Sequence, residues 1–145
     1  MGPSNTLMIV SMPLPTNQET STPLSRKTFR ILYADDMREL RDLAVITLGR
    51  DGHTVECVKD GQAALGRITA EPDSFDLLIT DHHMPNMNGL ELVQHVRTLP
   101  FKGKIIVFCS ELSQDVNQSY CDLKVDEILY KPIMPSELRS VLARL

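Results

Sequence analysis

Four side chains suited to phosphate chemistry each follow a short apolar run of the sequence, and they are Asp35, Asp36, Asp81 and Lys131. If these runs are parallel strands, their carboxyl ends meet at one edge of a sheet, where open α/β folds bind ligands. Clustered carboxylates repel one another, since two unit charges about 4 Å apart cost roughly 4 kcal/mol at an effective dielectric near 20. A divalent cation relieves that repulsion. With a lysine beside it, the cluster predicts a site that handles phosphoryl groups.

The elements that must position these residues alternate along the chain. Five apolar runs have the length and β-branched content of strands. They are residues 29–34, 53–58, 75–80, 104–109 and 126–130.

Amphipathic segments with helical spacing lie between and after the runs. Asp60-Gly61 and Asn88-Gly89 predict turns or helix starts, and Pro135 suits the first turn of the last helix. The segment 113–123 has the weakest apolar face. The three clearest stripes are Leu40, Leu43, Ala44 and Leu48; Leu92, Val93, Val96 and Leu99; and Leu138, Val141, Leu142 and Leu145.

Five strand–helix units with right-handed crossovers predict an α/β domain with a doubly wound, five-stranded parallel sheet and about five helices covering both faces. A chain of 145 residues is long enough for one such domain. The net charge of −4 and the lack of a basic block exclude direct nucleic-acid binding. No apolar run approaches the roughly 18 residues of a membrane span.

The three cysteines, Cys57, Cys109 and Cys121, are too scattered for a disulfide framework or a zinc site. They are expected to be small buried hydrophobic residues in a reducing compartment, which predicts a cytoplasmic protein. Residues 1–27 contain four prolines among Ser, Thr and Asn, which predicts an extended, poorly ordered arm before a domain at 28–145. Because nothing follows Leu145, no output domain is expected.

The ordered set of motifs resembles the receiver domain of two-component response regulators over residues 28–145. The motifs are Asp35-Asp36, Asp81 to Gly89 (DHHMPNMNG) and Lys131-Pro132. The resemblance implies a flavodoxin-like fold. It also implies that Asp81 accepts a phosphoryl group from a histidine kinase or a histidine phosphotransfer protein. The product is a labile mixed anhydride, so the protein is a phospho-acceptor with slow autodephosphorylation and not an enzyme.

The resemblance also implies the roles of the surrounding residues. Mg²⁺, or Mn²⁺, is bound by the side chains of Asp36 and Asp81, by Asp35 partly through water and by the backbone carbonyl of His83. Lys131 holds the phosphoryl oxygens, and the bond to Pro132 is expected to be cis. The alternative role for Asp35 is that it only caps the next helix and binds no metal. The His83 imidazole is either a surface group or, as a hypothesis, one that overhangs the site and tunes hydrolysis.

Two positions depart from the usual receiver pattern. Receivers place Thr or Ser at the end of the fourth strand, where spacing favours Cys109 here and Ser110 in a register shifted by one. A thiol is a poor donor compared with a hydroxyl. Receivers also carry an aromatic residue three positions before the lysine, where this chain has Ile128, and Tyr130 could take over part of its role.

Three functions are compatible with this sequence. The leading one is a phosphorylatable switch that signals through protein–protein contacts, on a surface around 113–123, 126–130 and the last helix that binds a target protein or a second copy of the chain. The alternative is a constitutive interaction module that keeps the acidic pocket without switching. A metal-dependent phosphohydrolase is disfavoured because the sequence offers no separate nucleophile or substrate cap.

Overall fold

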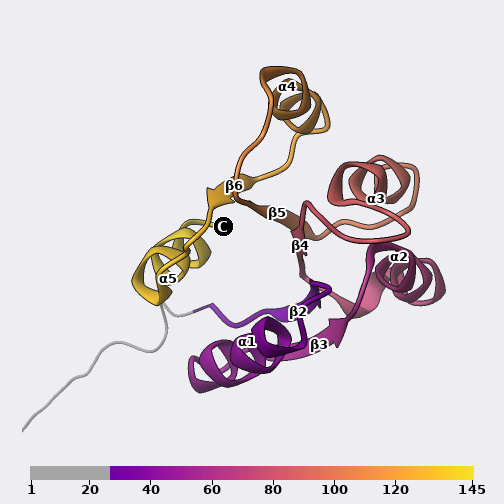
Figure 1. The fold of residues 1–145 in the computed structure, drawn as a ribbon. Coiled ribbons are helices and arrows are strands. Elements are labelled where there is room, and N and C mark those ends of the chain that lie inside the picture. The colour runs from indigo at the N-terminus through magenta and orange to yellow at the C-terminus, as the bar shows by residue number, and fades with distance from the viewer. Residues whose placement is uncertain (1–26) are drawn as a thin grey trace, which may run out of the picture.

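A computed structural model describes residues 27–145 as one parallel sheet between two layers of helices (Figure 1). The predicted arm at 1–27 lies outside the described residues except for Lys27. The five strands are β2 (Arg30–Ala34), β3 (Thr54–Val58), β4 (Leu77–Asp81), β5 (Lys104–Cys109) and β6 (Glu127–Tyr130). The helices are α1 (Arg38–Arg50), α2 (Gly61–Ala70), α3 (Gly89–Val96), α4 (Gln114–Asp122) and α5 (Pro135–Arg144).

The strand order is β3-β2-β4-β5-β6, and every pairing is parallel. From β2 the chain first passes to β3 at one edge of the sheet. It then returns to β4 on the other side of β2 and continues through β5 to β6 at the opposite edge. The order therefore reverses between β2 and β4, which are neighbours in the sheet. In doubly wound folds the crevice at the carboxyl ends of such a pair is the ligand site. The predicted doubly wound α/β fold is confirmed.

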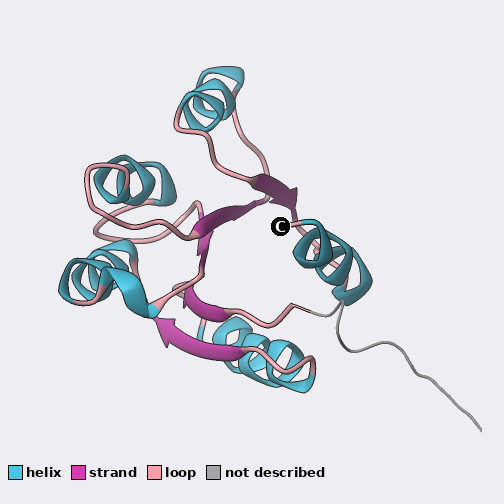
Figure 2. Ribbon diagram, turned by 180° about the vertical axis from the view of Figure 1, so that it is seen from behind, coloured by secondary structure: helices cyan, strands magenta, loops and turns pink. Residues whose placement is uncertain are grey.

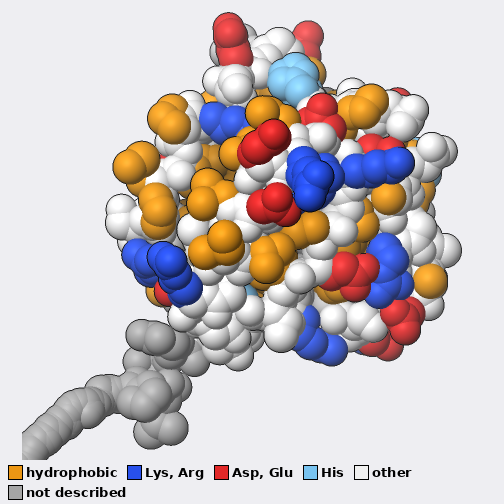
Figure 3. Space-filling view, turned by 60° about the horizontal axis from the view of Figure 1, so that its bottom comes forward, with side chains coloured by type: hydrophobic (Ala, Val, Ile, Leu, Met, Phe, Trp, Pro, Cys, Tyr) orange, Lys and Arg blue, Asp and Glu red, His pale blue; other side chains and the backbone are white. Residues whose placement is uncertain are grey.

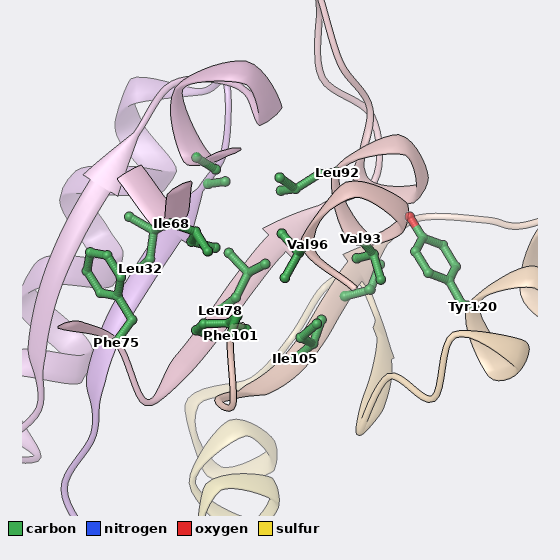
Figure 4. Close-up of a cluster of buried hydrophobic side chains, with 13 residues drawn as sticks. Leu32, Ile68, Phe75, Leu78, Leu92, Val93, Val96, Phe101, Ile105 and Tyr120 are labelled. Atoms are coloured by element: carbon green, nitrogen blue, oxygen red, sulfur yellow. The ribbon is translucent and has the colours of Figure 1, made fainter. Parts of the chain in front are cut away.

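Alternation along the strands divides the core into two layers, one on each face of the sheet. Figure 2 shows the strands in the middle of the molecule with helices on both sides. On one face Ala44 and Leu48 of α1 pack with Val141 and Leu142 of α5. On the other face α2, α3 and α4 pack over the sheet, with the fully buried Tyr120 at the α4 end of the cluster (Figure 4).

The sequence placed the start of β4 two residues too early. A short 3-10 turn at Pro72–Ser74 leads into Phe75, whose ring packs in the core, so β4 begins at Leu77. Asp76 instead ties the start of the sheet together. Its carboxylate accepts the Arg30 backbone N–H at 2.9 Å, and its carbonyl accepts the Lys104 backbone N–H at 2.9 Å.

Two expectations about burial were wrong. Leu43 was expected to belong to the buried stripe of α1 but is 54% exposed and lines an open apolar groove between α1 and α5. Cys121 was expected to be buried but is exposed on α4, whose inner face is occupied by Tyr120. Among residues 27–145, no helix combines the length and apolar character that crossing a membrane requires.

Candidate functional site

The three predicted carboxylates meet at the carboxyl edge of the sheet. Asp81 is the last residue of β4, and Asp35 and Asp36 directly follow β2. One carboxylate oxygen from each lies within 4.8 Å of those of the other two. Asp35 and Asp81 are buried, whereas Asp36 is exposed. Because β2 and β4 are paired, their parallel register brings these distant residues together.

Asp35 is held by its own surroundings. Its Oδ1 accepts the Met37 backbone N–H at 2.9 Å, and the Tyr33 hydroxyl donates to Oδ2 at 3.4 Å. The Arg41 guanidinium of α1 donates to the Asp35 carbonyl at 2.8 Å. Burial raises the pKa of the Asp35 carboxyl above its ordinary value, and the charge of Asp81 adds to the effect, against the Met37 hydrogen bond.

Lys131 approaches the cluster from the other side of β5. It directly follows β6, and its Nζ lies 3.1 Å from Oδ1 of Asp81. The Lys131–Pro132 peptide bond is cis. The same Oδ1 accepts the backbone N–H of His82 at 3.0 Å. One oxygen of the Asp81 carboxylate is therefore held by a cation and by an amide donor.

The loop from His82 to Asn88 is packed tightly at both ends. Near its start His82 donates its N–H to the Phe108 carbonyl at 2.8 Å, and near its end Met87 lies against Gly61 of α2. A Cβ atom on Gly61 would come within 2.5 Å of the Met87 carbonyl oxygen. Asn86, at φ 68°, donates from its side chain to Oδ2 of Asp60 at 3.0 Å. The loop therefore carries His83, which is exposed, on a fixed course beside the carboxylates.

Cys109 and Ser110 occupy different environments. Cys109 is the last residue of β5 and is fully buried, with its Sγ 3.8 Å from the Leu129 carbonyl oxygen. Burial, with a contribution from the charge of Asp81, raises the pKa of the Cys109 thiol. Ser110 follows the strand and is exposed. The side chain at the carboxyl end of β5 is therefore a thiol.

The two predicted switch-region residues also differ. Ile128 is partly buried and packs against the core cluster on the α2–α4 face. Tyr130 is 48% exposed, and its hydroxyl accepts a hydrogen bond from the Asn117 side chain of α4 at 3.0 Å. Tyr130 thus contacts α4 on the outside of the molecule.

Sequence reasoning missed several residues that surround the site. The turn or helix start predicted at Asp60-Gly61 is a helix start, and Asp60 is the N-cap of α2. The contact between Asp60 and Asn86 could not be predicted, because only the fold brings these residues together. The same is true of a 2.6 Å hydrogen bond between His82 Nδ1 and the Tyr120 hydroxyl.

The donor set fits a hard divalent cation. Three carboxylates supply oxygen ligands only, which suits Mg²⁺ or Mn²⁺. The pKa of the Asp35 carboxyl is raised chiefly by burial, with a further contribution from the negative charge of Asp81, so added positive charge would stabilise its ionised form. A cation bound by Asp35, Asp36 and Asp81 would supply that charge, with Lys131 at its border.

An apolar groove lies between α1 and α5 beside Lys131. Its volume is about 590 Å³, and Leu40, Leu43, Pro132 and Leu138 are among its lining residues. In the view of Figure 3, exposed hydrophobic side chains lie among acidic and basic ones.

Comparison with known proteins gives one consistent result. The family profile of the response regulator receiver domain matches residues 31–143. Response regulator MprA of Mycobacterium ulcerans is 34% identical over 109 residues, which are 75% of this chain and 46% of that protein. Sensor histidine kinase AruS of Pseudomonas aeruginosa is 31% identical over 127 residues, which are 85% of this chain and 12% of that protein. The chain thus spans less than half the length of either relative.

A solved structure extends the likeness to three dimensions. The chemotaxis protein CheY4 of Vibrio cholerae superposes with a TM-score of 0.73 and 30% sequence identity, covering 81% of this chain and 98% of that one. The match includes the five-stranded parallel sheet and its five helices. The chain belongs to the response regulator receiver domain family of two-component signalling.

Proposed function

We propose that this protein is a phosphorylatable signalling switch in which Asp81 accepts a phosphoryl group in a reaction that depends on Mg²⁺ or Mn²⁺. The donor is a histidine kinase or a histidine phosphotransfer protein. The phosphorylated protein then acts through contacts with a target protein or with a second copy of itself. The phosphoryl group is lost again by slow autodephosphorylation.

One observation carries this proposal. The carboxylate of Asp81 is buried among two other carboxylates, and its Oδ1 is 3.1 Å from the Lys131 ammonium. A structural role alone gives no reason to bury carboxylates of like charge together, because their repulsion destabilises the fold. Binding of a dianionic phosphoryl group and a divalent cation gives that reason.

Each residue of the site has a distinct role in phosphoryl transfer. An oxygen of Asp81 attacks phosphorus as the bond to the donor nitrogen breaks, and the donor imidazole leaves with that electron pair. The transfer needs alignment and neutralisation of the equatorial oxygens more than covalent assistance. Lys131 neutralises negative charge on one side of the phosphoryl group, and the backbone N–H of His82 holds the Asp81 carboxylate in position. The divalent cation supplies the remaining positive charge when bound.

Ligation of that cation would fall to Asp35, Asp36, Asp81 and the backbone carbonyl of His83. The tight packing of the loop at Gly61 supports the last assignment, because it fixes the course of the backbone that carries the carbonyl. The apolar groove between α1 and α5 lies next to Lys131 and is where a helical phosphodonor would reach Asp81.

Phosphorylation can be tested by intact-mass measurement. The chain is incubated with acetyl phosphate and Mg²⁺, and a mass gain of one phosphoryl group is expected. The gain should disappear in Asp81→Asn and on removal of Mg²⁺ by a chelator. The matched control is Asp122→Asn, which makes the same change on the exposed surface of α4.

The outcome separates the candidate functions. A gain that persists in Asp81→Asn would overturn the assignment of the phospho-acceptor. No gain in the unaltered chain, from either acetyl phosphate or a phosphorylated histidine phosphotransfer protein, would favour the constitutive interaction module. The buried thiol of Cys109, where receivers carry a hydroxyl, is the observation that supports this second candidate.

A further inference from the structure

A buried hydrogen bond connects the residue after Asp81 with helix α4. His82 is 8% exposed, Tyr120 is fully buried, and 2.6 Å separates the His82 Nδ1 from the Tyr120 hydroxyl oxygen. The two rings meet edge to face, with their centroids 5.6 Å apart. Burial of an imidazole and a phenol hydroxyl is costly unless they are paired, so each fixes the position of the other.

His82 is bonded to the phospho-acceptor through its backbone. Its N–H donates to Oδ1 of Asp81 at 3.0 Å, while its side chain contacts Tyr120. Asp81 and His82 point to opposite faces of the sheet because they are successive residues at the end of a strand. His82 therefore joins the carboxylate pocket on one side to α4 on the other.

The glycine at the start of α3 provides a second, independent observation. A Cβ atom on Gly89 would lie 2.6 Å from the Asp81 carbonyl oxygen and 2.7 Å from the Tyr120 hydroxyl. The Gly89 N–H also donates to the His82 carbonyl at 2.9 Å. The last residue of β4, the first residue of α3 and the Tyr120 hydroxyl thus meet at Gly89, where there is no room for a side chain.

Tyr120 is well placed to move α4. It is the one buried residue of that helix, and Val116 and Leu123 beside it are only partly buried. The remaining surface of α4 is polar and exposed. In Figure 4 the Tyr120 ring enters the core from α4, with its hydroxyl directed toward α3. A displacement of this ring therefore displaces the one fully buried anchor of α4, which the partly buried Val116 and the Asn117–Tyr130 hydrogen bond also hold.

We propose that the His82–Tyr120 hydrogen bond is the connection by which phosphorylation of Asp81 repositions α4. The inference rests on the proposed function. It assigns His82 and Tyr120 as positioning residues, in place of the hydroxyl and aromatic pair that Cys109 and Ile128 do not supply.

The chemistry of the modified carboxylate gives the cause. Transfer breaks the bond from phosphorus to the donor oxygen of acetyl phosphate, forms a bond to an Asp81 oxygen and releases acetate. The Asp81 carboxylate loses its delocalised charge and becomes an acyl phosphate, in which the two carboxyl-derived oxygens are weaker acceptors and the negative charge lies on the terminal phosphoryl oxygens. The His82 N–H, which Asp81 Oδ1 shares with the Phe108 carbonyl in the unmodified protein, then turns toward that carbonyl, and the imidazole moves relative to Tyr120. Only a difference in this geometry between the two states shifts the population of α4 positions.

The test compares Tyr120→Phe with Tyr130→Phe in the full chain. Tyr120→Phe keeps the ring and removes the buried hydroxyl, whereas Tyr130→Phe removes the exposed hydroxyl that accepts from Asn117. Backbone amide shifts are recorded by NMR before and after addition of acetyl phosphate with Mg²⁺, and intact mass gives the extent of phosphorylation. We expect normal phosphorylation of both variants, with the shift change at 114–122 reduced about twofold or more only in Tyr120→Phe.

A second pair of variants tests the other partner. His82→Asn keeps a polar atom near the position of Nδ1, whereas His82→Leu does not. We expect the α4 response to be retained at least in part by His82→Asn and lost in His82→Leu. This pair also decides the question if Tyr120→Phe fails to fold.

The outcomes distinguish the link from the function on which it rests. A normal mass gain together with an unaltered α4 response in Tyr120→Phe, or in His82→Leu, would overturn the link and leave Asp81 as phospho-acceptor. Loss of the response in Tyr130→Phe alone would also overturn it, in favour of the exposed contact with Asn117. Absence of the mass gain in the unaltered chain would overturn the proposed function itself.

Discussion

Lys131 and Asp81 form an ion pair across β5, with 3.1 Å between Nζ and Oδ1, although Asp81 ends β4 and Lys131 follows β6, which is not its neighbour in the sheet. The pair places a fixed positive charge beside the oxygen that would carry new negative charge during transfer. Lys131→Ala is therefore expected to slow phosphorylation by acetyl phosphate roughly 100- to 1,000-fold, by analogy with the loss of one electrostatic donor. The rate of mass gain measures this.

The same substitution should act in the opposite direction on cation binding. Removal of the ammonium removes its repulsion of Mg²⁺, so calorimetric affinity is expected to be maintained or increased. Lys102→Ala, an exposed change of the same charge, is the control and should alter neither quantity. Loss of both Mg²⁺ binding and phosphorylation in Lys131→Ala would show general disruption of the pocket instead.

Asp35 is expected to destabilise the metal-free protein. Its pKa is raised in the folded state by burial and by Asp81, so ionisation costs stability as the pH rises from the unfolded value of about 3.9 through the raised folded value. Above the raised folded pKa, Asp35 is ionised in both the folded and unfolded states, and the full loss of stability remains. Asp35→Asn keeps an acceptor for the Met37 N–H and should raise the metal-free melting temperature at pH 7 by roughly 4 °C, equivalent to about 1 kcal/mol.

Added Mg²⁺ provides the matched comparison for Asp35. The cation should stabilise the unaltered chain more than Asp35→Asn, because the variant lacks one ligand. Equal stabilisation of both proteins by Mg²⁺ would argue that Asp35 is only a cap of the turn before α1.

The N-cap of α2 should respond to pH in the opposite way. Asp60 accepts the Ala63 N–H at 2.7 Å, and this hydrogen bond lowers the pKa of the Asp60 carboxyl, with smaller help from Asn86. Its contribution is present above the unfolded pKa and is lost as the pH falls through the lowered folded pKa. Asp60→Ala is expected to cost about 1 kcal/mol at pH 7 and less in acid.

Ser113 offers a control that does not titrate. Its Oγ caps α4 by accepting the Val116 N–H at 3.2 Å. The cost of Ser113→Ala, measured by urea unfolding across the same pH range, should therefore be nearly constant. A cost of Asp60→Ala that is equally constant would show that the ionised form of Asp60 gives no special stabilisation.

The three thiols should react in a definite order. Cys121 is exposed, Cys57 is partly buried and Cys109 is fully buried, with a pKa that burial raises. Because the thiolate is the reactive form, iodoacetamide is expected to modify Cys121 first and Cys109 last. Peptide mass mapping over time gives the order, and in urea the three rates should converge. Early modification of Cys109 would show that the end of β5 opens readily.

The fold and the acidic pocket could be predicted because their signals are local. Each strand is a short run rich in apolar residues, and Asp35, Asp81 and Lys131 stand directly at strand ends, so the parallel sheet brings them together. The sequence could not show how far each helix stripe would be covered. Leu43 has the correct spacing but faces the open groove between α1 and α5, and no periodicity distinguishes it from the buried Leu48.

Contacts between side chains from separate units were also beyond the sequence. His82 and Tyr120 are 38 residues apart and meet only because α3 and α4 pack on the same face of the sheet. Sequence reasoning treats His82 as an ordinary surface or loop histidine, and Tyr120 as one of the few apolar residues on a weak helix. Their pairing depends on the close approach at Gly89, which is a property of the assembled backbone.

The two tight glycine contacts have a consequence for protein engineering. Gly61 fits the loop against α2, and Gly89 fits it against β4 and Tyr120, so its path is set largely by backbone contacts at its ends. In a saturation library, exposed positions such as His83 and Pro85 should accept many residues, whereas both glycines should accept almost none. The exposed positions of the loop between His82 and Asn88 are therefore a natural place to graft new side chains beside a reactive carboxylate without redesigning the scaffold.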